Sequence, residues 1–139
     1  MPERSPPSHR VLIADDESSI VTSLEFLMKQ RGYETRVARD GEEALALLPT
    51  FRPHLVLLDV MLPRRSGLEI CRYIRGEAAL ASTRVMMLTA KGSERDVLQG
   101  MEAGADDYVL KPFSTQELVS RVGALLATPG AGTPARGPA

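Results

Sequence analysis

The chain has 139 residues, 43% of them hydrophobic and 25% charged, which fits one globular domain with a core of ordinary size. Its 17 basic and 18 acidic residues give a net charge of −1, so it lacks the positive field that nucleic-acid binding requires, and we expect no direct contact with nucleic acid. The longest apolar runs are about five residues, against about 20 for a membrane span, and the polar start has no signal-peptide core. A lone cysteine, Cys71, excludes an internal disulfide, and we expect a cytoplasmic protein.

Two terminal stretches differ from the rest of the chain. Residues 1–9 and 128–139 are rich in Pro, Gly, Ala, Ser and Thr, and we interpret both as flexible extensions of a single domain over residues 10–127. Inside that domain, short apolar runs typical of strands lie at 11–14, 35–38, 55–58, 85–88 and 108–110.

Each apolar run is followed by a stretch with helical spacing. The first helix is expected to end at Gly32, and the last to begin at Ser114, with Glu117 three residues later completing a capping box. Small residues mark ends of the other helices: Gly41, Ser66 and Ser93 open the three middle ones, and Gly104 closes the fourth.

The strand segments are apolar at consecutive positions, as in LVLLD and VMMLT. Both faces of such strands must be covered, which is typical of a parallel sheet with helices on either side. The sequence therefore predicts an α/β fold, a flavodoxin-like doubly wound (βα)5 domain whose five-stranded parallel sheet has the order 2-1-3-4-5.

Polar side chains follow four of the five predicted strands. Asp15 and Asp16 follow the first, Asp59 the third, Thr89 the fourth and Lys111 the fifth, and ligands of such sheets bind beyond these carboxyl ends. Three clustered carboxylates repel one another unless a cation lies among them, and oxygen ligands without His or Cys select Mg²⁺, Mn²⁺ or Ca²⁺. Lys111 and Thr89 suit phosphoryl oxygens, and an Asp carboxylate is a competent nucleophile. The residues indicate a site for a metal ion and a phosphoryl group.

Four segments, LIADDE, LVLLDVMLPRRSG, VMMLTAKG and GADDYVLKPFSTQEL, resemble the receiver domains of two-component response regulators over about residues 10–127. The resemblance implies that Asp59 is the phosphoacceptor. It also implies that Asp16 and Asp59 supply carboxylate ligands to Mg²⁺, that Asp15 acts mainly through water, and that the backbone carbonyl of Met61 is the remaining protein ligand.

The same resemblance assigns the rest of the site and the reaction. Thr89 and Lys111 would bind the phosphoryl oxygens, Tyr108 would swing inward when Thr89 moves, and the bond between Lys111 and Pro112 would be cis. The phosphoryl group would come from a sensor histidine kinase, a phosphotransfer protein or a small donor such as acetyl phosphate. The face formed by the fourth helix, fifth strand and fifth helix would then rearrange. Such a domain is a self-phosphorylating switch and not a turnover enzyme.

The sequence leaves two alternatives for the domain or protein on which such a switch would act. The segment GADDYVLKPFSTQEL looks most like the receivers of winged-helix transcription regulators, which suggests that the tail leads to an effector domain. The alternative is a stand-alone phosphorelay or single-domain regulator that acts on a partner protein.

Assembly depends on the same predicted face. Asp106 and Asp107 fit either a turn or the interface ion pairs of the winged-helix relatives, where Arg121 would meet one of them across a two-fold axis. Val97 stands where those relatives have a basic partner for Glu117. We expect a monomer or a weak, phosphorylation-enhanced dimer.

Each site residue also has a purely structural interpretation. Asp15 and Asp16 precede a helix and fit an N-cap, Asp59 fits a turn, and Lys111 fits a solvated strand end. Turn chemistry gives no reason for these four residues to end the first, third and fifth strands of one sheet together, so we favour a shared site.

The remaining polar residues are expected to be structural. His9 and His54 are expected in solvent, Cys71 is expected to pack as a small hydrophobe, and Arg64 and Arg65 are expected in a solvated loop, where meeting a phosphodonor is the alternative.

Two other classes of protein fit the sequence less well. A haloacid-dehalogenase-type phosphatase carries a second Asp two residues after its nucleophile, where this chain has Met61. A flavodoxin-like FMN carrier has a Ser/Thr/Gly-rich phosphate loop after its first strand. This chain has DDES there, whose charge repels a bare phosphate.

Overall fold

A computed structural model describes residues 9–127 of the chain. One five-stranded parallel sheet has the strand order β2-β1-β3-β4-β5, as predicted from the sequence. Its strands are β1 (Arg10–Ala14), β2 (Glu34–Ala38), β3 (Leu55–Leu58), β4 (Arg84–Thr89) and β5 (Asp107–Leu110). The helices are α1 (Ser18–Gln30), α2 (Gly41–Phe51), α3 (Gly67–Gly76), the 3₁₀ turn η1 (Ala78–Leu80), α4 (Glu94–Ala103) and α5 (Thr115–Ala127). Among residues 9–127, no helix has the length and apolar character needed to cross a membrane.

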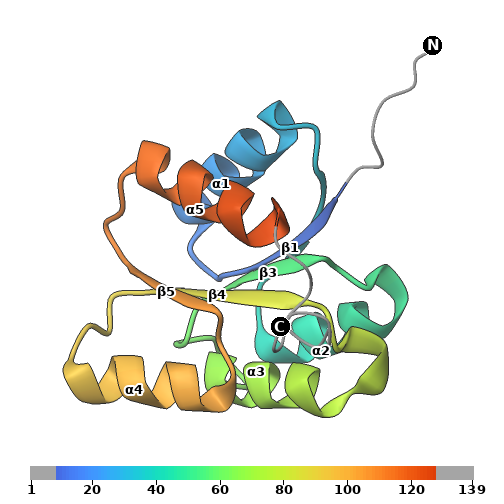
Figure 1. The fold of residues 1–139 in the computed structure, drawn as a ribbon, viewed down its shortest axis with the longest axis vertical. Coiled ribbons are helices and arrows are strands. Elements are labelled where there is room, and N and C mark those ends of the chain that lie inside the picture. Colours follow the sequence, from blue (N-terminus) through green and yellow to red (C-terminus); the bar gives the residue numbers. More distant parts are fainter. Residues whose placement is uncertain (1–8, 128–139) are drawn as a thin grey trace.

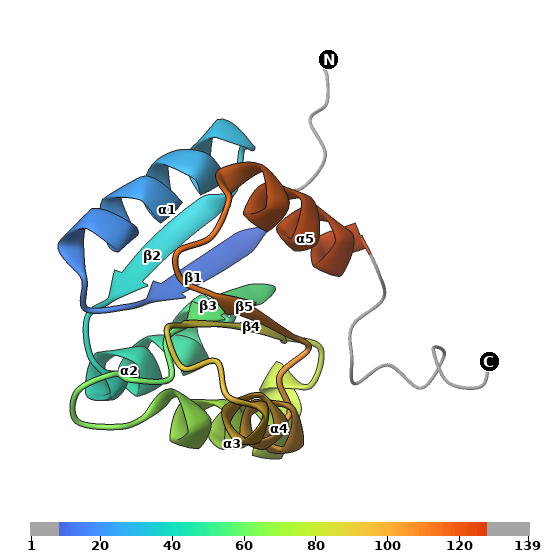
Figure 2. The same cartoon turned by 90° about the vertical axis from the view of Figure 1, so that its left-hand side faces the viewer.

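The helices form two layers with the sheet between them. Helices α1 and α5 cover one face, and α2, α3 and α4 cover the other (Figures 1 and 2). Every residue of β3 and β4 is buried, which explains why these strands are apolar at consecutive positions.

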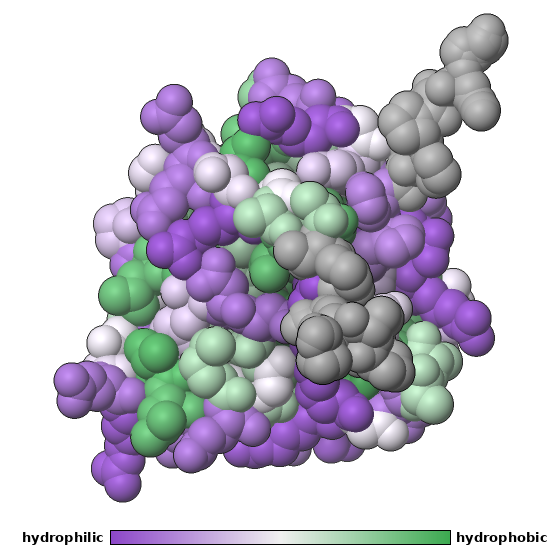
Figure 3. Space-filling model, viewed as in Figure 1, coloured by the Kyte–Doolittle hydropathy of each residue, from purple (hydrophilic) through white to green (hydrophobic). Residues whose placement is uncertain are grey.

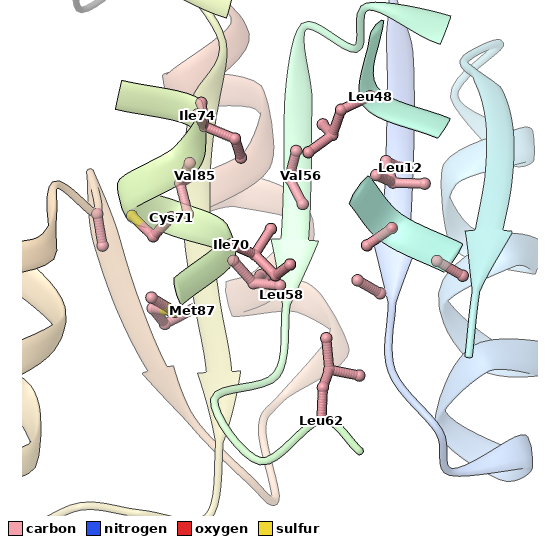
Figure 4. Close-up of a cluster of buried hydrophobic side chains, with 14 of the residues drawn as sticks. Leu12, Leu48, Val56, Leu58, Leu62, Ile70, Cys71, Ile74, Val85 and Met87 are labelled. Atoms are coloured by element: carbon pink, nitrogen blue, oxygen red, sulfur yellow. The ribbon is translucent and has the colours of Figure 1, made fainter. Parts of the chain in front are cut away.

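Alternate strand residues enter two separate cores. In β1, Val11 and Ile13 pack on the side of α1 and α5, whereas Leu12 packs on the opposite side with residues of α2 and α3. Figure 4 shows this second core, in which Ile70 and Ile74 of α3 lie against strand side chains. The two-residue period of a strand thus supplies both helical layers.

Most of the predicted helix ends are confirmed. Ser66 and Ser93 are N-caps, each within a capping box, and Gly104 is a C-cap with a φ of 112°. Gly32 lies one residue beyond the C-cap of α1 and has a φ of 82°.

The starts of α2 and α5 show further detail. Gly41 is the first residue of α2, as predicted, and the helix is capped by Asp40, whose side chain accepts a hydrogen bond from the Glu43 backbone N–H. The Ser114 hydroxyl accepts from the Glu117 N–H at 3.1 Å as expected, but the Glu117 carboxylate accepts from Arg121.

The two histidines lie at the amino ends of β1 and β3, and the expectation that they point into solvent is wrong. Nδ1 of His54 accepts a hydrogen bond of 2.8 Å from the Arg10 backbone N–H, and the centroids of the His9 and His54 rings are 5.1 Å apart. Because β1 and β3 are parallel neighbours in the sheet, the residues just before these two strands lie side by side although they are far apart in the sequence. Burial, with smaller contributions from Arg10 and His9, lowers the pKa of His54.

Cys71 is buried in the core of α2 and α3, as predicted. Its Sγ lies 3.4 Å from the carbonyl oxygen of Ala103, and burial raises the pKa of its thiol to about 11. The thiol therefore packs as a small apolar group.

The residues that directly follow β1, β3 and β5 continue the backbone hydrogen bonding of the sheet. The Asp15 N–H donates to Ala38, the Asp59 N–H to Ala14 and the Lys111 N–H to Thr89, in each case at the backbone carbonyl. These bonds fix the positions at which the side chains leave the sheet.

Candidate functional site

Three carboxylates meet beyond the ends of β1 and β3. One oxygen from each of Asp15, Asp16 and Asp59 lies within 4.8 Å of the others. Asp15 and Asp59 are 1% and 7% exposed, whereas Asp16 lies at the exposed rim. The cluster predicted from the strand ends is therefore present, with two of its three carboxylates buried.

Lys111, directly after β5, joins this cluster. Its Nζ lies 2.8 Å from Asp15 Oδ2, 3.1 Å from Asp59 Oδ2 and 3.1 Å from Glu17 Oε1, and its side chain is only 11% exposed. The expected cis peptide between Lys111 and Pro112 is present. Glu17 also follows the first predicted strand, directly after Asp15 and Asp16 in the DDE run, but no role was assigned to it from the sequence.

Burial and mutual hydrogen bonding act in opposite directions on the pKa values of Asp15 and Lys111. Burial raises the pKa of Asp15, hydrogen bonds from Lys111 and from the Glu17 backbone oppose this, and repulsion from Asp59 is a smaller cause. Burial alone would lower the pKa of Lys111, but its hydrogen bonds to the carboxylates of Asp15, Asp59 and Glu17 outweigh burial and raise that pKa above its ordinary value. Desolvation, more than the mutual repulsion assumed from the sequence, perturbs Asp15, and Lys111 stays cationic.

Asp59 is held in one orientation by the loop that follows β3. Its Oδ1 accepts a hydrogen bond of 2.9 Å from the Met61 backbone N–H, while Oδ2 faces Lys111. The chain then turns back so closely that a Cβ on Gly67 would overlap the carbonyl oxygen of Asp59. Gly67 is therefore required for α3 to begin beside the carboxylate.

Thr89 and Tyr108 both form hydrogen bonds with the backbone of Lys91. Thr89 is fully buried, and its Oγ accepts from the Lys91 N–H at 3.2 Å. The Tyr108 hydroxyl donates to the Lys91 carbonyl at 2.7 Å. Burial, with smaller contributions from Asp96 and Asp59, raises the pKa of Tyr108. Lys91 was not singled out from the sequence, because its contribution is made entirely by backbone atoms.

The structural interpretations of the site residues fail in two places. The N-cap of α1 is Glu17, so neither Asp15 nor Asp16 caps that helix, and Asp15 instead accepts from the Glu17 N–H. Lys111 is enclosed by carboxylates and is not a solvated strand end.

The arginine pair after Pro63 contacts α2. Arg64 lies 3.4 Å from the Asp40 carboxylate and Arg65 lies 3.2 Å from the Glu42 carboxylate. Both arginines are exposed, so the loop is solvated as expected but is also held by ion pairs.

Asp106 and Asp107 are engaged within the chain, whereas the sequence left a choice between a turn and an interface role. Asp106 accepts from Arg75 at 2.7 Å and from Arg84 at 3.4 Å. Asp107 accepts from Arg121 at 2.7 Å. Glu117, expected to lack a basic partner, also pairs with Arg121, at 3.0 Å.

The donor set fits a hard divalent cation. The three carboxylates offer only oxygen atoms, they converge within the distance that one ion spans, and Lys111 already places a positive charge in contact with two of them. Such ligands favour Mg²⁺ over zinc, and Mg²⁺ leaves coordination positions for water and for phosphate oxygens.

Comparison with known proteins agrees with this geometry. The family model for the response regulator receiver domain matches residues 11–123. A putative response regulator from Chloroflexus aurantiacus is 39% identical with a TM-score of 0.83, covering 88% of this chain and 100% of that one. A BeF3-activated DrrB receiver domain is 37% identical with a TM-score of 0.80, covering 88% and 100%. The receiver domain of a signal transduction histidine kinase from Syntrophus aciditrophicus is 34% identical with a TM-score of 0.80, covering 86% and 91%.

Proposed function

Since the chain belongs to the response regulator receiver domains, which are phosphoacceptor switches and not turnover enzymes, we propose that it accepts a phosphoryl group on Asp59. The observation that carries this proposal is the position of the Asp59 carboxylate. It is buried beyond β3, oriented by the Met61 N–H and in contact with the Lys111 ammonium group. Among the three clustered carboxylates, it is the one at the end of the central strand.

The proposed reaction is an in-line transfer. An oxygen of Asp59 attacks the phosphorus of a phosphohistidine or of acetyl phosphate. The new O–P bond forms as the donor's N–P or O–P bond breaks, and the leaving group takes that electron pair. Lys111 moves from the carboxylates to a phosphoryl oxygen, and the Thr89 hydroxyl donates to another.

The metal proposed for this site is Mg²⁺, held by the carboxylates of Asp16 and Asp59 and the backbone carbonyl of Met61, with Asp15 acting through water. When bound, Mg²⁺ neutralises charge on the phosphoryl oxygens. The three convergent carboxylates support this assignment, and Lys111 supplies the second positive charge that the transferred group needs.

Phosphorylation is proposed to change the face of α4, β5 and α5. The added charge draws Thr89 toward the phosphoryl group, and Tyr108 packs further inward as Thr89 moves, which shifts the population between two packings. The partners proposed for the two ends of this process are a sensor histidine kinase or phosphotransfer protein as donor, and an output domain or partner protein as target, in the cytoplasm.

The output face carries exposed apolar side chains. Leu98, Met101 and Leu110 are large and exposed, and Figure 3 shows hydrophobic side chains over part of α4, beside hydrophilic ones. We keep both proposals for the output: an effector domain of the winged-helix kind, or a separate protein bound by a single-domain regulator. Of the predicted flexible extensions, residues 1–9 and 128–139, all but His9 lie outside the described residues. His9 contacts the rings of Tyr33 and His54.

The phosphoacceptor assignment is tested by labelling with acetyl phosphate and Mg²⁺. We expect one phosphoryl group on the wild type, none on Asp59→Asn, and loss of both Mg²⁺ binding and labelling in Asp16→Ala. Glu25→Gln, an acidic position on α1 that pairs with Lys29, is the charge-matched control and should label normally. Undiminished labelling of Asp59→Asn refutes the assignment.

A further inference from the structure

A glycine lies in the interior of α4, a position at which glycine destabilises a helix relative to most other residues. Gly100 is buried in this ten-residue helix, and glycine is among the poorest helix-forming residues. A Cβ at this position would lie 2.7 Å from Cε2 and 2.9 Å from Cδ2 of Tyr108. The Tyr108 ring therefore fills the space that any other residue at position 100 would take.

Two other helical glycines have open space instead. A Cβ on Gly123 in α5 or on Gly76 at the end of α3 would meet nothing within 4 Å. At Gly100 the close neighbour is an aromatic ring whose hydroxyl is also anchored, at the Lys91 carbonyl. The ring therefore cannot move away from position 100 without stretching or losing that hydrogen bond.

Tyr108 is connected to Thr89, a residue of the proposed phosphorylation site, through the backbone of Lys91. The carbonyl of Lys91 holds the Tyr108 hydroxyl, and its N–H donates to Thr89 Oγ. A hydroxyl that accepts from a backbone N–H keeps its own proton free to donate elsewhere. With Tyr108 against Gly100, the loop after β4 thus holds Thr89 Oγ as an acceptor and leaves its proton free to donate to a ligand.

We propose that Gly100 is a positioning residue for phosphoryl binding: by lacking a side chain, it lets Tyr108 lie against α4 and hold Lys91, which orients the Thr89 hydroxyl. This inference rests on the proposed phosphoacceptor function and adds a residue of α4 to it. It also explains how the state of the site is coupled to α4, since one ring contacts both the helix and the loop that carries Thr89.

The test is a beryllofluoride titration with Mg²⁺, followed by NMR, on the full chain. Gly100→Ala should weaken binding by about threefold or more, whereas Gly123→Ala, the matched helical control, should leave the dissociation constant unchanged. Tyr108→Phe keeps the ring but loses the hydroxyl bond to Lys91, and it should weaken binding in the same direction. Thermal unfolding of each variant shows which of them fold.

A double-mutant cycle separates positioning from a general effect on α4. In a Tyr108→Ala background, the ring that a Cβ would meet is absent, so Gly100→Ala should have no further effect on binding. If Gly100→Ala weakens binding equally in both backgrounds, or if Gly100→Ala and Tyr108→Phe both bind as the wild type does, the proposal is overturned. Failure of the wild type itself to bind beryllofluoride or to label at Asp59 would instead overturn the proposed function.

Discussion

Removing the carboxylate of Asp106 should destabilise the fold far more than removing that of its neighbour Asp107. Asp106 Oδ2 accepts from Arg75 at 2.7 Å and from the Val85 backbone N–H at 2.8 Å, and Oδ1 accepts from Arg84 at 3.4 Å. The carboxylate thereby joins α3 and β4 to the start of β5. Asp107 makes one ion pair, with an Arg121 side chain that is 40% exposed.

The magnitude follows from burial. The Arg84 side chain is 6% exposed, so Asp106→Ala leaves a buried guanidinium without this carboxylate and removes two further hydrogen bonds. Loss of one partner of a buried pair costs about 3–5 kcal/mol. Because Arg75 also donates to the carbonyls of Gly104 and Thr83, we expect a value near the lower end, about 3 kcal/mol. Asp107→Ala breaks an exposed pair, which contributes about 0–1 kcal/mol.

Urea unfolding measures the two free energies under the same conditions. Asp106→Ala should shift the midpoint to lower urea by several times the shift of Asp107→Ala, with similar m-values. Equal shifts for the two variants would refute the argument that burial of the Arg84 pair sets the cost. Asp106→Asn, which keeps the shape but loses the charge, should fall between the wild type and Asp106→Ala.

Three further outcomes are expected. The pKa of His54 is lowered in the folded state, so the unfolded state binds more protons as the pH falls below about 6.5, and the free energy of unfolding should decrease there. His54→Gln should reduce this pH dependence in urea titrations, and an unchanged dependence would show that His54 does not cause it. Cys71, whose thiol has a pKa of about 11, should stay unreactive to a thiol reagent at neutral pH until the chain unfolds, and rapid reaction of the native protein would show that it is not buried. Because Arg121 already pairs with Asp107 and Glu117 within the chain, sedimentation should show a monomer, or a weak dimer that beryllofluoride strengthens, and a tight dimer in both states would contradict this.

The sheet and the centre of the site follow from sequence because local pattern carries them. The runs before Asp15, Asp59 and Thr89 are apolar at consecutive positions, which predicts buried parallel strands, and the doubly wound order then places their following residues at one edge. Lys111 follows in the same way from the fifth run. These inferences need only the strand ends and the strand order.

Features that depend on contacts between distant segments were beyond the sequence. Asp106 meets Arg75 and Arg84 because α3 and β4 converge on the start of β5. His54 receives the Arg10 N–H because β1 and β3 begin together. The sequence shows only that Gly100 is a poor helix former inside a predicted helix. The reason for a glycine there is the Tyr108 ring packed against it, which only the structure shows. Tertiary packing decides each of these, and periodicity does not report it.

Whether Asp59 receives the phosphoryl group can be tested by locating the modified residue with mass spectrometry. After incubation with acetyl phosphate and Mg²⁺, the aspartyl phosphate is reduced with borohydride and the digested peptides are sequenced. We expect one modified residue, Asp59, in the peptide that spans β3 and the loop after it. Modification at Asp15 or Asp16 with an unmodified Asp59 would contradict it.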